Sequence, residues 1–263
     1  MSFGDHLKQW RTRRHRSQLD LSLSAEVSQR HLSWLETGKS TPSRDMIVRL
    51  ADVLEVPLRE RNEWLGSAGF APLYGERSVD EAQMAPVRMA LDVLLSHHDP
   101  YPAFVLDRCW RMQQANQSAL KIISMFGDED QLWERVDPTG HRSLARLTFH
   151  PDGMRPYIKN LDAVAVHFMQ RWMHDIRLSG SDDEHIEMKA VRALIGDLEW
   201  QAAESQMLVP VIPLELETPF ATLRMTSIIS TFGTAQDITV DELRIEQFFP
   251  ADDDTRNALV AFG

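Results

Sequence analysis

Cysteine is almost absent from this 263-residue chain. Only Cys109 is present, so no intrachain disulfide can form. No stretch approaches the roughly 18 consecutive apolar residues of a membrane-spanning helix, and the amino-terminal stretch MSFGDHLKQWRTRRH lacks the uninterrupted apolar segment of a secretory signal. These absences predict a cytoplasmic protein that has no membrane partner.

Motifs typical of enzymes are also missing. The chain contains no HExxH, no paired CxxC, no GxSxG and no GxGxxG. Two histidine arrangements leave a metal-dependent enzyme as an alternative: His97 and His98 beside Asp99, or His167 and His174 seven residues apart on one predicted helix face. Without further ligands or a catalytic motif we expect no enzymatic activity, no bound metal and no cofactor, apart from an aliphatic ligand.

Positive charge is scarce overall but concentrated in one region. The net charge is −11, yet residues 1–44 carry 8 Lys and Arg against 4 Asp and Glu, whereas residues 76–263 carry 17 against 30. The densest basic cluster is RTRRHR, residues 11–16, which by itself is equally compatible with the solvated end of a helix. Such an asymmetry is typical of a nucleic-acid-binding module joined to a domain with another task.

The length and the 43% hydrophobic content predict two globular domains. We expect an all-α domain over residues 1–70, a linker over 71–86 that contains Gly and Pro without clear periodicity, and an α+β domain over 87–263. In the first domain, Phe3, Leu7 and Trp10 recur at helical spacing. Four further short helices are predicted, three of them after serine residues suited to cap a helix: Ser17, Ser28 and Ser43.

The helix predicted after Ser28 is the most informative element of the first domain. It directs Leu32 and Leu35 inward and presents hydrogen-bonding groups outward: Gln29, Arg30 and Ser33. We expect Glu36, by contrast, to form a structural ion pair with an Arg of the first helix, because phosphates repel a carboxylate.

Two stretches, SQLDLSLSAEVSQRHLSWLETGKSTPS and IVRLADVLEVPLRERNEWLGSAGFAP, resemble the Xre/Cro-type helix-turn-helix of MmyB-like bacterial transcription regulators. The resemblance implies that Gln29, Arg30 and Ser33 read base edges of a double-stranded DNA operator. It further implies that a set of polar residues contacts phosphates: Gln18, Ser28, Lys39 and Ser43. One departure is Glu26, which stands in the turn where many such proteins have Gly.

In the second half of the chain, the sequence pattern changes from one typical of helices to one typical of β-strands. Strands are predicted over 102–107, 109–116, 209–217, 220–231 and 242–249, with helices between the second and third. In the fourth strand, Leu223, Met225, Ser227, Ile229 and Thr231 share one face. This pattern predicts a five-stranded antiparallel sheet wrapped by helices.

Two segments of this half, RSLARLTFHPDGMRPYIKN and STFGTAQDITVDELRIEQFFPAD, resemble the MmyB-like ligand-binding domain, which is PAS-like. The resemblance implies a sensor of an apolar small molecule, with a long-chain fatty acid as a known type of occupant. We also expect a homodimer, because recognition helices are usually presented in pairs. Arg146 and Arg155 are the candidates to bind the ligand carboxylate. The candidate lining residues are Met112, Phe149, Met154, Met225 and Phe232, although each is also a plausible core residue. The alternative is a domain that serves dimerisation or partner docking without a ligand.

Overall fold

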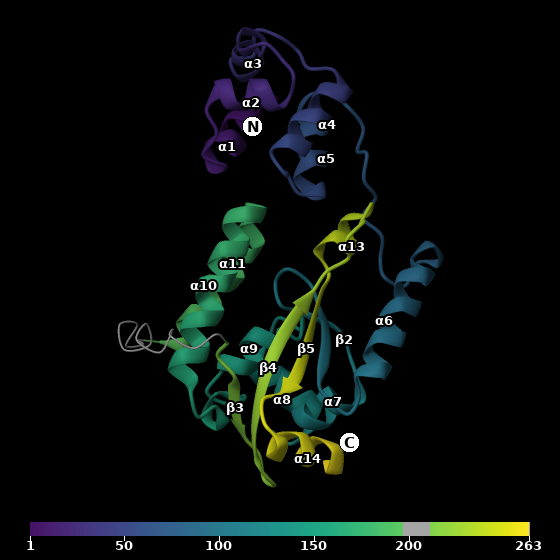
Figure 1. The fold of residues 1–263 in the computed structure, drawn as a ribbon, viewed down its shortest axis with the longest axis vertical. Coiled ribbons are helices and arrows are strands. Elements are labelled where there is room, and N and C mark those ends of the chain that lie inside the picture. Colours follow the sequence, from purple (N-terminus) through teal and green to yellow (C-terminus); the bar gives the residue numbers. More distant parts are fainter. Residues whose placement is uncertain (197–210, 263) are drawn as a thin grey trace. The chain divides into compact units, whose positions relative to one another are not determined.

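The computed structural model describes residues 1–196 and 211–262 (Figure 1). The chain forms two compact units. Unit 1 comprises Met1–Ser78 together with Thr234–Asp241, and unit 2 comprises Val79–Gly233 together with Glu242–Gly263. The boundary between the units lies inside the expected linker of residues 71–86, since residues 71–78 belong to unit 1 and the remainder begins unit 2.

Unit 1 is built from short helices around a shared apolar core. Its amino-terminal helices are α1 (Phe3–Arg13), α2 (Gln18–Ser24), α3 (Gln29–Glu36), α4 (Arg44–Val53) and α5 (Leu58–Ser67). The expected serine caps are in place, since the Ser17, Ser28 and Ser43 hydroxyls each accept a backbone N–H of the following helix. These caps satisfy backbone donors that the first helical turn leaves free.

An ionic network orients the first three helices of unit 1. Arg11 on α1 donates from Nε and Nη2 to the two carboxylate oxygens of Glu36 on α3, at 2.6 and 3.1 Å. Gln18 on α2 donates to the same carboxylate at 2.7 Å. The predicted ion pair of Glu36 is thus confirmed, and it ties α3 to both helices that precede it.

Unit 2 contains a five-stranded antiparallel sheet in the order β2-β1-β5-β4-β3. Its strands are β1 (Ala103–Leu106), β2 (Met112–Ala115), β3 (Leu214–Glu217), β4 (Thr222–Ser230) and β5 (Arg244–Pro250). The predicted strands are therefore present, although the first two residues of the stretch 209–217 lie outside the described residues.

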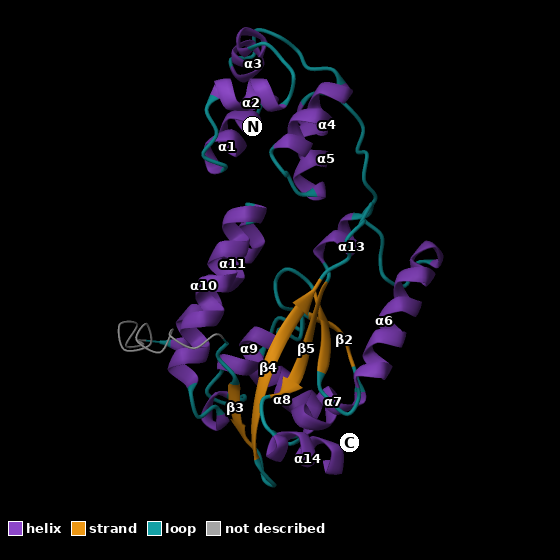
Figure 2. Cartoon of the chain, in the orientation of Figure 1, coloured by secondary structure: helices purple, strands orange, loops and turns teal. Residues whose placement is uncertain are grey.

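Helices pack on both faces of this sheet (Figure 2). On one face, α6 places Leu91 and Leu95 against Val105 and Ile245. On the other face, Phe104 and Leu106 join a larger core with several helices. Among the described residues, the helical elements of this unit are η1 (Ala82–Met84), α6 (Ala85–His98), α7 (Gln117–Ser124), α8 (Glu129–Val136), α9 (Leu144–Phe149), η2 (Arg155–Tyr157), α10 (Leu161–Ser179), α11 (Asp182–Ile195) and α14 (Asp253–Phe262).

Two of these helices, α8 and α14, were not anticipated from the sequence. The short helix α13 (Ile238–Glu242), also unanticipated, lies between β4 and β5 in the chain, and residues 234–241 belong to unit 1. There the backbone N–H of Ile238 donates to the carbonyl of Gly75 at 2.8 Å. The Arg77 guanidinium also pairs with the Asp237 carboxylate at 2.8 Å. The β4–β5 connection is therefore held by the segment that follows α5.

Candidate nucleic-acid interface and ligand cavity

Helix α3 presents its polar face outward because its apolar face is completely buried. Leu32 and Leu35 are at most 1% exposed, and both belong to the core of unit 1. Gln29 and Arg30, in the first turn, are exposed, and Ser33 is half-buried. The exposed amino-terminal turn of such a helix is the part that a helix-turn-helix domain inserts into the major groove.

Arg30 is held by an aromatic neighbour on the same helix. Its guanidinium carbon lies 4.5 Å from the ring centroid of Trp34, which is 38% exposed. This cation–π contact restricts the guanidinium before any DNA arrives. Trp34 was missed by sequence reasoning, although its position four residues after Arg30 was a usable signal.

Three of the four predicted phosphate-contacting residues already use part of their hydrogen-bonding capacity within unit 1. The Ser28 and Ser43 hydroxyls accept helix N–H groups at 3.1 and 3.2 Å, which leaves each O–H free to donate. Gln18 uses one amide N–H for Glu36 and retains the other. Lys39 is exposed after Gly38, whose φ is +70°.

In unit 2, a cavity of about 160 Å³ lies between the sheet and the helices that cover its larger core. Its walls are mostly aliphatic and aromatic side chains from the strands β1, β3, β4 and β5 and from the helices α7, α9 and α10. Among the described residues the lining includes Phe104, Trp110, Ile122, Ile123, Leu144, Phe149, Met154, Phe168, Leu216, Met225, Ile229 and Phe248.

The sheet register sets the composition of the cavity wall. On the central strand β5, Glu246 pairs with Phe104 of β1 on one side and with Ile229 of β4 on the other. Phe248, two residues further, pairs with Ser227. Since paired residues share a face of the sheet, this places one carboxyl and one hydroxyl among the apolar side chains.

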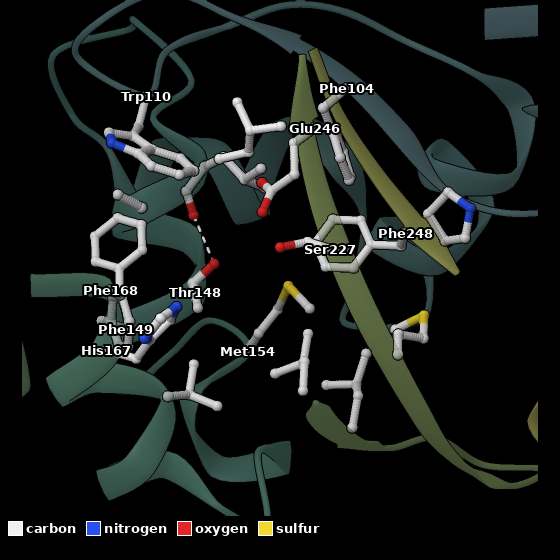
Figure 3. A pocket seen from close by; sticks show the side chains of 18 of the residues that line it. Phe104, Trp110, Thr148, Phe149, Met154, His167, Phe168, Ser227, Glu246 and Phe248 are labelled. Atoms are coloured by element: carbon white, nitrogen blue, oxygen red, sulfur yellow. Dashed lines mark hydrogen bonds between the residues drawn. The ribbon is translucent and has the colours of Figure 1, made fainter. Parts of the chain in front are cut away.

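Figure 3 shows the side-chain oxygens of Glu246, Ser227 and Thr148 directed toward the centre of the cavity. Glu246 is 8% exposed, and burial raises the pKa of its carboxyl to about 7. A hydrogen bond with Ser227 and the charge of Arg171 oppose this rise in pKa. The Thr148 hydroxyl donates to the Leu144 carbonyl at 2.8 Å and retains capacity to accept. Among the described residues, the cavity thus has a mostly apolar wall that includes a few polar side chains.

The two arginines expected to bind a ligand carboxylate do not line the cavity. Arg146 donates to both carboxylate oxygens of Glu187, at 2.6 and 2.7 Å. This ion pair also raises the pKa of Arg146. Arg155 donates to the Leu194 carbonyl at 2.6 Å. The prediction for both is corrected, because each serves to hold the covering helices together.

The predicted lining residues divide into two groups. Phe149, Met154 and Met225 line the cavity. Met112 and Phe232 do not, because Met112 packs against the edge of the larger core and Phe232 packs against the α6 face of the sheet.

The polar lining residues Ser227, Glu246, His167 and Arg171 were missed as site residues. A signal for Glu246 was present in the sequence: a carboxyl two residues before Phe248 in a predicted strand shares its face.

The described residues contain no group of three or more His, Cys, Asp and Glu placed to hold a metal ion. Within the same residues, every helix is too short or too polar to cross a bilayer.

Two family models match this chain. Residues 87–261 match the model described as the MmyB-like transcription regulator ligand binding domain, which covers unit 2 almost completely. Residues 2–64 match a helix-turn-helix domain, which covers α1 to α5 except for the last residues of α5. Both are binding domains. No curated protein matches the chain.

Proposed function

Since this chain belongs to the MmyB-like transcription regulators, we propose that it reads operator DNA in the cytoplasm as a homodimer and that a long-chain fatty acid in the unit 2 cavity changes its operator affinity. The chain is a transcription regulator with a helix-turn-helix domain and a ligand-binding domain. The operator reading, the dimer, the fatty acid and the modulation are the proposal.

The cavity itself is the main observation that supports a fatty-acid ligand. A mostly apolar cavity with a few polar side chains suits a molecule that has an aliphatic chain and a polar end. Met154 and Met225 contribute flexible, polarizable side chains to the wall, which can adapt to chains of different length.

The support for operator reading comes from the exposed turn of α3. Gln29 suits adenine and Arg30 suits guanine, because each can make two hydrogen bonds to the major-groove edge of that base. One recognition helix covers only a short stretch of bases. A homodimer that presents two such helices about 34 Å apart reads two half-sites and gains both affinity and specificity.

The path of the chain supports a connection between the two activities. Strands β4 and β5 both contribute side chains to the cavity, and the segment that joins them, residues 234–241, belongs to unit 1. A ligand that changes the spacing or twist of these strands therefore acts on a segment anchored in the DNA-binding unit.

The proposal is tested by organic extraction of the purified, denatured protein, followed by mass spectrometry for lipids. We expect a stoichiometric aliphatic acid in the wild type and its loss in Met225→Trp, because the indole fills the cavity. Met89→Trp is the matched control, since Met89 is 68% exposed on α6 and does not line the cavity. This control retains the lipid if the cavity is the binding site.

If the extraction finds no lipid in the wild-type protein, this protein is incubated with fatty acids and used in operator titrations. If no fatty acid binds and operator affinity stays constant, the ligand proposal fails. That result would favour a domain that serves dimerisation or partner docking.

A further inference from the structure

An ionised fatty-acid carboxylate inside the cavity needs hydrogen-bond donors, because an unpaired charge in an apolar cavity is costly. The two arginines that the sequence suggested, Arg146 and Arg155, bind other groups of the chain. Among the described lining residues, the cationic or potentially cationic side chains are Arg171 and His167 on α10, and both residues are exposed. The covered part of the wall offers a carboxyl group instead.

Glu246 occupies that covered part. It lies on the central strand, flanked by Phe104 and Ile229, and its carboxyl points into the cavity beside the Ser227 hydroxyl (Figure 3). Two ionised carboxylates cannot occupy such a space together, because their repulsion is strong in an apolar surrounding. A ligand carboxylate can approach only if one proton is shared between the two groups.

We propose, building on the fatty-acid function above, that Glu246 is the anchoring residue of this cavity and that its protonated carboxyl donates a hydrogen bond to the ligand carboxylate. Ser227 provides a second hydroxyl beside the pair. Binding in this form requires the proton on Glu246, so the protein binds an aliphatic acid more tightly in acidic conditions than in alkaline ones.

The groups that face Glu246 are Ser227 on β4, Phe104 on β1 and, across the cavity, Thr148 on α9 with His167 and Arg171 on α10. Only His167 and Arg171 among them can carry a charge near neutral pH. Burial raises the pKa of the Glu246 carboxyl to about 7, so the proton is present below that pH and is lost above it. A protonated His167 would also favour an anion at low pH, and the experiment separates the two.

The test measures the dissociation constant of dodecanoic acid between pH 6 and 8.5 for the full chain. Over this range the acid is ionised in water. In the wild type we expect affinity to fall about tenfold for each pH unit above 7, since only the protonated fraction is competent to bind. Glu246→Gln carries a permanent neutral donor and should hold one affinity across the range, within about twofold.

Glu215→Gln is the matched control for the substitution. Glu215 lies on β3, pairs with Arg224 at 3.2 Å and does not line the cavity, so this variant should keep the wild-type pH profile. Dodecan-1-ol is the matched control for the ligand. Its hydroxyl can donate to an ionised Glu246 or accept from a protonated one, so its affinity should change little with pH.

Several outcomes overturn the inference while the fatty-acid function stands. They are a wild-type affinity that does not change with pH, a pH dependence that persists in Glu246→Gln and so belongs to His167, and an equal dependence for dodecan-1-ol. The comparison of the two ligands on the wild type decides the question even if Glu246→Gln does not fold. Failure of the wild type to bind dodecanoic acid or any longer-chain fatty acid at any pH overturns the proposed function as well.

Discussion

At the scale of single residues, the cost of burying a polar group among apolar side chains determines its protonation. The carboxyl of Glu246 lies beside Phe104 and Phe248. When it is ionised there, its charge lacks hydration by water, and no full ion pair replaces that hydration. In the proposed function, this residue provides a hydrogen-bonding group at a defined point of a mostly apolar cavity. The same feature affects the stability of the folded chain.

The stability of the protein should fall as pH rises through the titration of Glu246. The folded-state pKa, about 7, lies above the ordinary value of 4.5, so between these values the folded state binds more protons than the unfolded one. From pH 4.5 to 7.5, the free energy of unfolding should decrease by about 3 kcal/mol relative to that of Glu246→Gln. Denaturant unfolding of both proteins at several pH values measures this difference. Parallel pH profiles would show that Glu246 titrates normally.

Arg30 illustrates the opposite situation, an exposed charge that is positioned for a partner. Its contact with Trp34 reduces the number of guanidinium orientations, which lowers the entropy lost on docking to a base. We expect Arg30→Ala to weaken operator binding by about 1–3 kcal/mol and to relax the preference at one base pair.

Titration with an operator and its single-base variants tests this expectation for Arg30. Lys39→Ala serves as the comparison. A lysine that contacts only phosphate should weaken binding to all sequences alike and reduce the salt dependence by about one phosphate contact. Unchanged operator affinity in Arg30→Ala would mean that another part of the chain reads the bases.

At the scale of secondary-structure elements, the turn between α2 and α3 contains a residue in an unusual backbone conformation. Glu26 adopts φ +55°, a left-handed conformation that glycine reaches without a steric penalty. The side chain is exposed, so nothing clashes with it, and only the backbone is strained. The chain therefore tolerates a residue with a Cβ where glycine is common.

Glu26→Gly should stabilise unit 1 by up to about 1 kcal/mol, because relief of the left-handed penalty exceeds the added entropy of the unfolded chain. Glu26→Val should destabilise it, by more than about 1 kcal/mol, since a β-branched residue is least compatible with positive φ. Thermal unfolding followed by far-UV circular dichroism compares the three proteins. Equal stability of the Gly and Val variants would be inconsistent with a left-handed turn.

At the scale of the whole molecule, the chain does not divide into two consecutive domains. It leaves unit 2 after Gly233, contributes residues 234–241 to unit 1, and returns to form β5. Within unit 1, the Arg77–Asp237 ion pair and the backbone hydrogen bond between Ile238 and Gly75 hold this segment. Two strands of the cavity wall therefore begin or end at a segment that is fixed in the DNA-binding unit.

Arg77→Ala should reduce the coupling between fatty acid and operator while leaving each separate affinity nearly unchanged. The coupling free energy expected for the wild type is about 1–3 kcal/mol, and by linkage it is the same whichever partner binds first. Operator titrations with and without dodecanoic acid measure it. Arg59→Ala is the control, because Arg59 pairs with Glu76, outside the 234–241 segment. Full coupling in Arg77→Ala would exclude this ion pair as part of the connection.

The sequence alone determined the elements whose signals are local. Serine caps, helical spacing of apolar residues and strand alternation predicted α1 to α5 and the five strands of the sheet. The carboxylate of Glu36 was correctly predicted to pair with an Arg of the first helix, because phosphates repel a carboxylate and a structural ion pair was therefore the expected role.

The composition of the cavity was decided only by the tertiary structure. Glu246 became a cavity residue because the register of β1, β4 and β5 placed it between Phe104 and Ile229, and register depends on contacts distant in sequence. Arg146 was lost as a ligand-binding residue for the same reason, since its partner Glu187 lies on another helix 41 residues later. Local patterns specify which face of an element is buried, whereas the neighbour that it meets there is set by long-range packing.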